Sequence, residues 1–150
     1  MIRLKVVIEH TGENFPPPDW DLRVQRSLAA LAERMQERFE EYPPETIANM
    51  SDNPSGRWWE RGLGWVYLSG QVEPISEHLG DRWIVQMERM NQVNLANQAS
   101  YSTVVHATEH QADFLKRIGW PTGQEVFEML LNSKEIEMIL EEHLLEGLNG

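Results

Sequence analysis

Cysteine is absent from this chain of 150 residues, which excludes disulfide scaffolds, cysteine-ligated zinc, iron–sulfur clusters and thiol catalysis. No apolar run approaches the roughly 18 residues that a membrane-spanning helix needs. The N-terminal segment 1–9 alternates apolar and charged residues and offers no continuous apolar core of signal-peptide length. We therefore expect a soluble protein that acts where it is made and has no membrane partner.

Cationic residues are also scarce: 13 Lys and Arg stand against 24 Asp and Glu, for a formal net charge of −11. Proteins grip nucleic acid through Lys and Arg that displace counterions, so this balance argues against sequence-specific nucleic-acid binding. Near the C-terminus one cation, Lys134, stands among seven glutamates: Glu125, Glu128, Glu135, Glu137, Glu141, Glu142 and Glu146. Such a run is typical of a solvated helix face, and it is also compatible with a functional negative surface.

Signatures of catalysis are missing. There is no G-x-S-x-G and no Walker A motif, and Gly62-Leu63-Gly64 is followed by Trp65 instead of opening a helix. Carboxylates are abundant, but abundance in an acidic chain does not nominate a general acid and base. His10, His78 and His143 are isolated in the sequence and read as surface or turn residues. We therefore expect no enzyme activity, no catalytic residues and no cofactor.

One segment does match a catalytic pattern, because His106-Ala107-Thr108-Glu109-His110 fits the H-x-x-E-H motif of zinc peptidases. On a helix the two histidines would share a side and bind zinc, with Glu109 as general base. A third ligand is needed, and the near candidates are Glu141 and Glu142. The β-branched run 103–105 favours a strand over the required helix. A plain polar strand-to-helix junction is the simpler interpretation, and a small metal-dependent hydrolase remains the alternative.

The length and the apolar fraction of 41% suit a single domain, residues 1–150, with a sizeable core. Residues 2–8 alternate apolar and charged side chains, which predicts a strand, and the prolines within 10–18 keep the next segment extended. Asp19 or Asp21 can cap a long helix that ends at Pro43-Pro44. Its expected apolar face comprises Leu22, Leu28, Leu31, Ala32, Met35 and Phe39.

The rest of the chain predicts one meander and several shorter helices. Segment 45–70 reads as a long loop or irregular hairpin, in which adjacent Trp58 and Trp59 cannot face the same core if they lie on a strand. We expect strands at 83–87, 93–95 and 101–105, and helices at 109–118, from the Thr122–Glu125 capping box onward, and from Ser133 to Gly147. The fold class is thus α+β: a small antiparallel sheet packed by one long helix, with C-terminal helices forming an appendage at 121–150.

Two stretches carry a family resemblance. The first is Ser76-Glu77-His78-Leu79-Gly80-Asp81-Arg82-Trp83, and the second runs from Asn97 through Tyr101 and Gln111 to Gly119-Trp120. With the upstream helix they resemble the neck and tail-completion proteins of long-tailed bacteriophages, over about residues 1–121. Those sequences often have a second aromatic residue three positions after the tyrosine, where this chain has Val104.

The resemblance implies a non-enzymatic virion protein, made in the host cytoplasm, that forms a ring around the DNA channel and joins the head connector to the tail tube. It implies a hexamer or dodecamer, with portal or adaptor and tail-tube or tail-terminator proteins as partners. Loop 51–70 and the terminal helices are the natural contact elements, and the candidate interface residues are Arg57, Trp58, Trp59, Arg61 and Tyr67. Candidate residues facing the channel, where negative charge would repel DNA, are Glu135, Glu137, Glu141 and Glu142.

The motif residues are expected to build the fold rather than to make contacts; they are Ser76, Leu79, Gly80, Trp83, Tyr101, Gly119 and Trp120. Within the same resemblance a tail terminator or a minor tail subunit is an alternative. A free-standing intracellular adaptor is a further possibility from another class.

Overall fold

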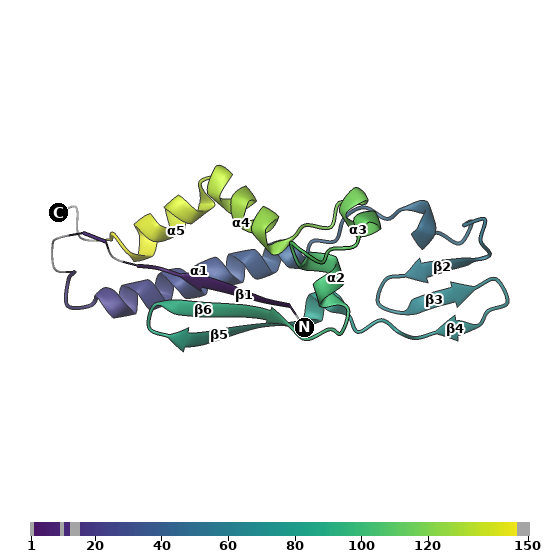
Figure 1. Ribbon diagram of the computed structural model, residues 1–150, viewed down its shortest axis with the longest axis horizontal. Helices are drawn as coiled ribbons and strands as arrows, with labels where there is room; N and C mark the ends of the chain where they lie inside the picture. The colour runs from purple at the N-terminus through teal and green to yellow at the C-terminus, as the bar shows by residue number, and fades with distance from the viewer. Residues whose placement is uncertain (1, 10, 13–15, 147–150) are drawn as a thin grey trace.

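The computed structural model describes residues 2–9, 11–12 and 16–146 and shows an elongated α+β protein with a body and a projecting arm (Figure 1). The body contains three strands: β1 (Ile2–Val7), β5 (Trp83–Arg89) and β6 (Gln92–Asn97). Its main helices are α1 (Trp20–Glu40), α4 (Gly123–Asn132) and α5 (Glu135–His143). None of the helices in the described ranges is long and apolar enough to cross a bilayer.

The sheet of the body is antiparallel, and its strand order is β1-β6-β5. β5 and β6 form the expected meander, and the N-terminal strand pairs with β6, which is therefore central. Leu4 lies opposite Leu95, which in turn lies opposite Val85. Because side chains alternate across a strand, this register places Leu4, Val6, Val93 and Leu95 on one face of the sheet, toward the core.

Helix α1 covers this apolar face. Its buried residues recur at spacings of three and four and include Leu28, Leu31, Met35 and Phe39. Asp19 is the residue before the helix, as expected, although its carboxylate pairs with Arg23 at 2.8 Å instead of capping the backbone. The expectation for Leu22 is wrong, because its side chain is 48% exposed, whereas Trp20 and Val24 on either side of it pack in the core cluster that holds Val93.

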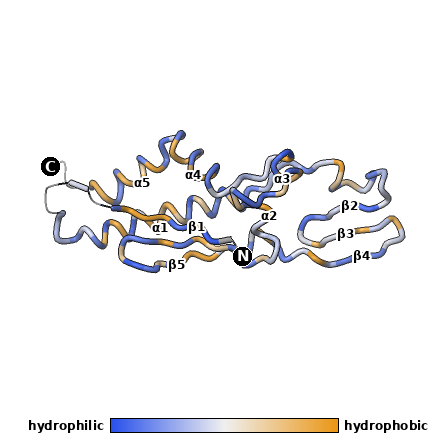
Figure 2. Tube along the Cα trace, viewed as in Figure 1, coloured by the Kyte–Doolittle hydropathy of each residue, from blue (hydrophilic) through white to orange (hydrophobic). Residues whose placement is uncertain are grey.

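Helices α4 and α5 belong to the same core and do not form a separate appendage. Thr122 and Glu125 make the predicted capping box. At Gly123, a Cβ atom would lie 2.4 Å from Leu4 Cδ2, so the start of α4 can approach β1 only with glycine. Val126 and Leu130 then pack beside Phe39 and Trp83. Figure 2 shows hydrophobic and hydrophilic residues alternating along both helices, as expected for helices with one buried face.

The start of the last helix differs from the sequence expectation. Its N-cap residue is Lys134, in a left-handed conformation with φ 64°, and Ser133 instead closes α4. Helix α5 ends at His143, and the expected stop at Gly147 lies outside the described residues.

The arm is the predicted irregular hairpin, extended by a third short strand. It comprises β2 (Arg57–Glu60), β3 (Gly64–Tyr67) and β4 (Val72–Glu73), which form a separate antiparallel sheet in that order. A short 3-10 helix, η1 (Ile47–Asn49), lies beside β2. Gly64 has φ 122°, and a Cβ atom there would lie 2.3 Å from the carbonyl oxygen of Glu73, so the close approach of β3 and β4 depends on this glycine.

The predicted strand at 101–105 is wrong, because residues Ser102–His106 form a short helix, α2. Val105 and His106 are buried in this conformation, and Val105 packs against Leu79 and Ala99. Burial thus overrides the β preference of the run Thr103-Val104-Val105. The next helix, α3 (Asp113–Arg117), is shorter than expected, since residues 107–110 form a turn.

Candidate functional site

The arm brings three of the five candidate interface residues onto one face. Arg57, Trp59 and Tyr67 share this face with Trp65, because Arg57 lies opposite Tyr67 and Trp59 opposite Trp65. The rings of Trp59 and Trp65 meet edge to face at 5.4 Å, and the guanidinium of Arg57 lies 4.6 Å from the Trp65 ring centre. These contacts stiffen the aromatic side chains within the arm.

The other two candidate residues lie elsewhere. Trp58 is half-buried on the opposite face of β2, across from Val66. Arg61 ties the arm to the body, because it donates to the carbonyl oxygen of Pro43 and lies 5.4 Å from the ring centre of Tyr42. Arg61 is therefore placed to fix the orientation of the arm.

The most exposed part of the arm was missed by the sequence analysis. All eight residues of 68–75 are exposed, and three of them are large and apolar: Leu68, Val72 and Ile75. Leu68 is 73% exposed, although most leucines are buried in folded proteins. The signal in the sequence was the occurrence of these residues beside Ser69-Gly70 and Pro74, where no core can form. The arm thus combines rigid aromatic rings with an exposed apolar strip at 68–75.

The two motif stretches contact each other in the structure, where they form one corner between β5, β6 and α2. Fully buried Asn97 donates to the carbonyl oxygen of Leu79 at 2.7 Å and accepts from Ala99 N at 2.9 Å. The backbone N–H of Glu77 donates to the hydroxyl of Tyr101 at 3.1 Å, and the Glu77 carboxylate accepts from Ser100. The hydrogen bonds from Ser100 lower the pKa of Glu77.

Gly80, Gly119 and Trp120 also support the fold, as expected. Tyr42, which the sequence analysis did not single out, accepts a hydrogen bond from Gly80 N at 2.8 Å and packs against Trp120, with ring centres 5.0 Å apart. Gly119 adopts φ 97°, which favours glycine. Ser76 makes only a long contact, 3.4 Å from its hydroxyl to the N–H of His78.

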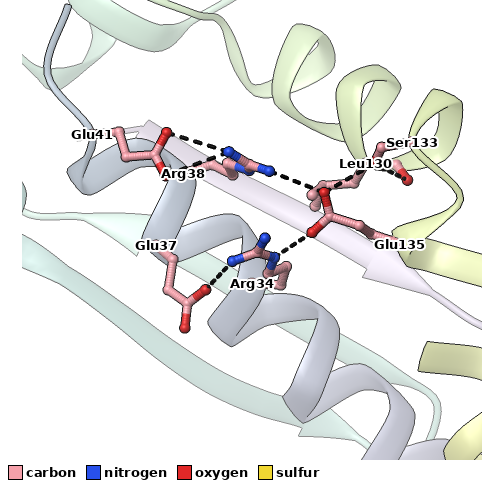
Figure 3. A network of polar contacts seen from close by, with 7 residues as sticks. All are labelled: Arg34, Glu37, Arg38, Glu41, Leu130, Ser133 and Glu135. Carbon is pink, nitrogen blue, oxygen red and sulfur yellow. Dashed lines mark hydrogen bonds and ion pairs between the residues drawn. The ribbon is translucent and has the colours of Figure 1, made fainter. Parts of the chain in front are cut away.

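The four candidate channel residues divide into one carboxylate paired with arginines, Glu135, and three carboxylates that are exposed on α5. Glu135 contacts Arg34 and, at 3.0 Å, Arg38, and it accepts from the Ser133 hydroxyl at 2.9 Å (Figure 3). These hydrogen bonds, that of Arg34 foremost, lower the pKa of Glu135 to about 2. Its charge is therefore matched within the chain, and its structural role is to join α5 to α1.

The other three candidate channel residues are Glu137, Glu141 and Glu142, which are exposed on α5. Among the described side chains, Glu142 has an ionic neighbour in His143, at 4.0 Å. That they face a DNA passage stays a prediction.

The H-x-x-E-H segment does not adopt the geometry that zinc catalysis requires. His106 ends α2 and is fully buried, whereas Glu109 and His110 lie in the exposed turn that follows. Nδ1 of His106 donates to the carbonyl oxygen of Pro121 at 2.6 Å. Nε2 is buried without a hydrogen-bond partner among the described residues, in a ring cluster of Phe39, Trp83 and Trp120. Within the described ranges, no three His, Asp or Glu side chains are grouped to hold a metal ion.

We expect the purified protein to bind no stoichiometric zinc, because the two histidines do not share a helix side and one of them is enclosed by aromatic rings. Elemental analysis after dialysis against zinc measures this directly. One tightly bound zinc per chain, lost together with hydrolytic activity in His110→Ala, would instead support the hydrolase. His110 is exposed, so this variant leaves the core intact.

Comparisons with protein-family models, with curated proteins and with solved structures found no match for this chain.

Proposed function

We propose that the protein is a structural subunit of the neck or tail top of a long-tailed bacteriophage, where a ring of copies joins the head connector to the tail tube. Support comes from the resemblance carried by residues 76–83 and 97–120, and from an arm suited to contacts with other subunits. The proposed location is the virion, and the proposed partners are further copies of the chain and the adjoining connector and tail proteins.

The single observation that carries this proposal is the projecting arm with its exposed strip 68–75. In a free monomer, this three-stranded sheet lies away from the core of the body (Figure 1). Exposure of its large apolar side chains to water is unfavourable. Burial of Leu68, Val72 and Ile75 against a partner would remove this penalty. On the face of the arm opposite to Val72, Arg57, Trp59 and Tyr67 supply a second, rigid surface of the residue types that dominate protein interfaces.

The alternative of a metal-dependent hydrolase has less support, because the buried ring of His106 and the exposed turn holding Glu109 and His110 do not form a common site. The exposed arm is equally compatible with a tail terminator or a minor tail subunit. The phenotype of a gene deletion distinguishes these proteins from a joining protein. A free-standing adaptor would use the same surface without entering a virion.

Deletion of the gene from the phage that encodes it tests the function. We expect DNA-filled heads and separate tails of normal length, because both parts assemble but cannot join. Negative-stain electron microscopy of lysates distinguishes the outcomes. Overlong tails would identify a terminator instead, and complete infectious particles would contradict the proposal. Complementation with Leu68→Ser/Val72→Ser should fail, whereas Glu33→Lys, exposed on α1, should restore joining.

A further inference from the structure

In the body, the long helices pack on one face of the sheet; on the other, here called the open face, the central strand β6 is buried and side chains of the outer strands are exposed. Helices α1, α4 and α5 all pack on the face that holds Leu4 and Leu95. Alternation places Arg3 and Lys5 of β1 on the open face, together with Gln92 and Asn94 of β6. Arg89 lies beside Gln92 after a bulge in β5.

This open face carries a net positive charge in an acidic protein. Arg3, Lys5 and Arg89 form no ion pair with any described residue, and the strands carry one carboxylate, Glu88, which gives a net charge of +2. The Glu88 carboxylate is occupied by amides, since it accepts from Gln92 and, at 2.6 Å, from Asn94. In the turn after β5, Met90 is exposed. We call the surface formed by Arg3, Lys5, Arg89 and Met90 the sheet side.

The opposite side of the body has the reverse charge. Helices α4 and α5 contain no Lys or Arg, and their outward residues include Glu137, Glu141 and Glu142. Apolar side chains stand among them, with Met138 64% exposed and Met129 and Leu131 exposed as well. We call this surface the helix side. In Figure 1, α4 and α5 run along one long side of the body and β5 along the other.

We propose that the sheet side of one copy binds the helix side of the next copy of this chain. The three unpaired cations match the three exposed carboxylates of α5, and methionines on both surfaces can adapt to one another. Because the two surfaces lie on opposite sides of the body, the contact is head-to-tail, leaves a free surface at each end, and repeats until a ring closes. This inference rests on the proposed ring. It places the carboxylates of α5 against a neighbouring subunit, whereas the earlier prediction places them at the DNA passage.

Reciprocal charge reversal tests the contact in the full-length protein. The sheet variant is Lys5→Glu/Arg89→Glu, the helix variant is Glu137→Lys/Glu141→Lys, and the control is Glu33→Lys/Glu40→Lys, which reverses two exposed charges of α1 outside both surfaces. Sedimentation velocity at low ionic strength, up to the highest soluble concentration, measures association. Circular dichroism confirms that each variant is folded.

We expect each variant alone to associate about tenfold more weakly than wild type, because like charges then face each other across the contact. An equal mixture of the two variants should recover association, since every contact in an alternating ring again joins opposite charges. The quadruple variant should recover it for the same reason, and the control should match wild type. This pattern requires a contact between these two surfaces, and the size of the wild-type assembly separates a ring from a dimer.

Three results would overturn the inference: a wild type that stays monomeric at every concentration, single variants that associate like wild type, or a mixture without recovery. If the helix variant associates normally but retains DNA in the channel, the carboxylates that it replaces face the passage. Failure of this inference is distinct from failure of the proposed function. The deletion phenotype shows whether the phage head is joined to its tail, and it does not depend on which surfaces of the subunits meet.

Discussion

Replacement of Trp83 by alanine is expected to lower the free energy of unfolding by about 3–5 kcal/mol, the usual effect of removing a large aromatic side chain from a core. Trp83 is 6% exposed and stacks on Phe39, with ring centres 4.3 Å apart and planes at 21°. It also lies beside His106 and packs with Leu95 and Leu130. Its loss would leave a cavity where the sheet, α1 and α4 meet.

Denaturant unfolding monitored by circular dichroism measures this effect. The matched control is Trp59→Ala or Trp58→Ala, because both side chains lie in the arm and outside the core clusters of the body. These variants should unfold at a midpoint near that of wild type and associate more weakly in sizing chromatography. An unchanged midpoint in Trp83→Ala with loss of oligomers would contradict this division between core and contact residues.

Acidification from about pH 7.5 to about pH 5 is expected to lower the free energy of unfolding by about 2 kcal/mol through His106 alone. Burial lowers the pKa of His106 from 6.5 to about 4, and the hydrogen bond to Pro121 offsets this only in part. The unfolded chain therefore takes up a proton first. The stabilisation is complete above pH 6.5 and is lost as the pH falls from there toward about 4.

The difference between wild type and His106→Gln isolates this contribution. The variant will be less stable, but its stability should fall less between the two pH values because the titrating ring is gone. An NMR titration of the His106 ring protons provides an independent readout, and a midpoint near 6.5 would contradict the burial argument.

Much of the body could be predicted from local patterns. Three predictions depend only on neighbours in the sequence, and each is confirmed. They are the two-residue repeat of residues 2–8, the helical spacing of Leu28, Leu31 and Met35, and the Thr122–Glu125 capping box. The errors occur where distant residues decide. The helix at 102–106 forms because Val105 fits beside Leu79, and Leu22 is exposed because Val24 and Leu28 lie on the side of α1 that meets the sheet.

The candidate site was predicted in part. Aromatic residues marked the arm as unusual, but which of them share a face depends on the register of β2 and β3. Glu135 illustrates the limit, because nothing local indicates that Arg34 and Arg38, about 100 positions earlier, neutralise it. The open, cationic face of the sheet likewise emerges only after β1 pairs with β6.

A reconstruction of the intact virion neck tests the central claim most directly. The account predicts copies of this chain in a closed ring on the axis between head connector and tail tube, each with its arm, residues 57–73, against a neighbouring subunit. Copies located away from this axis, or absent from the particle, would contradict it.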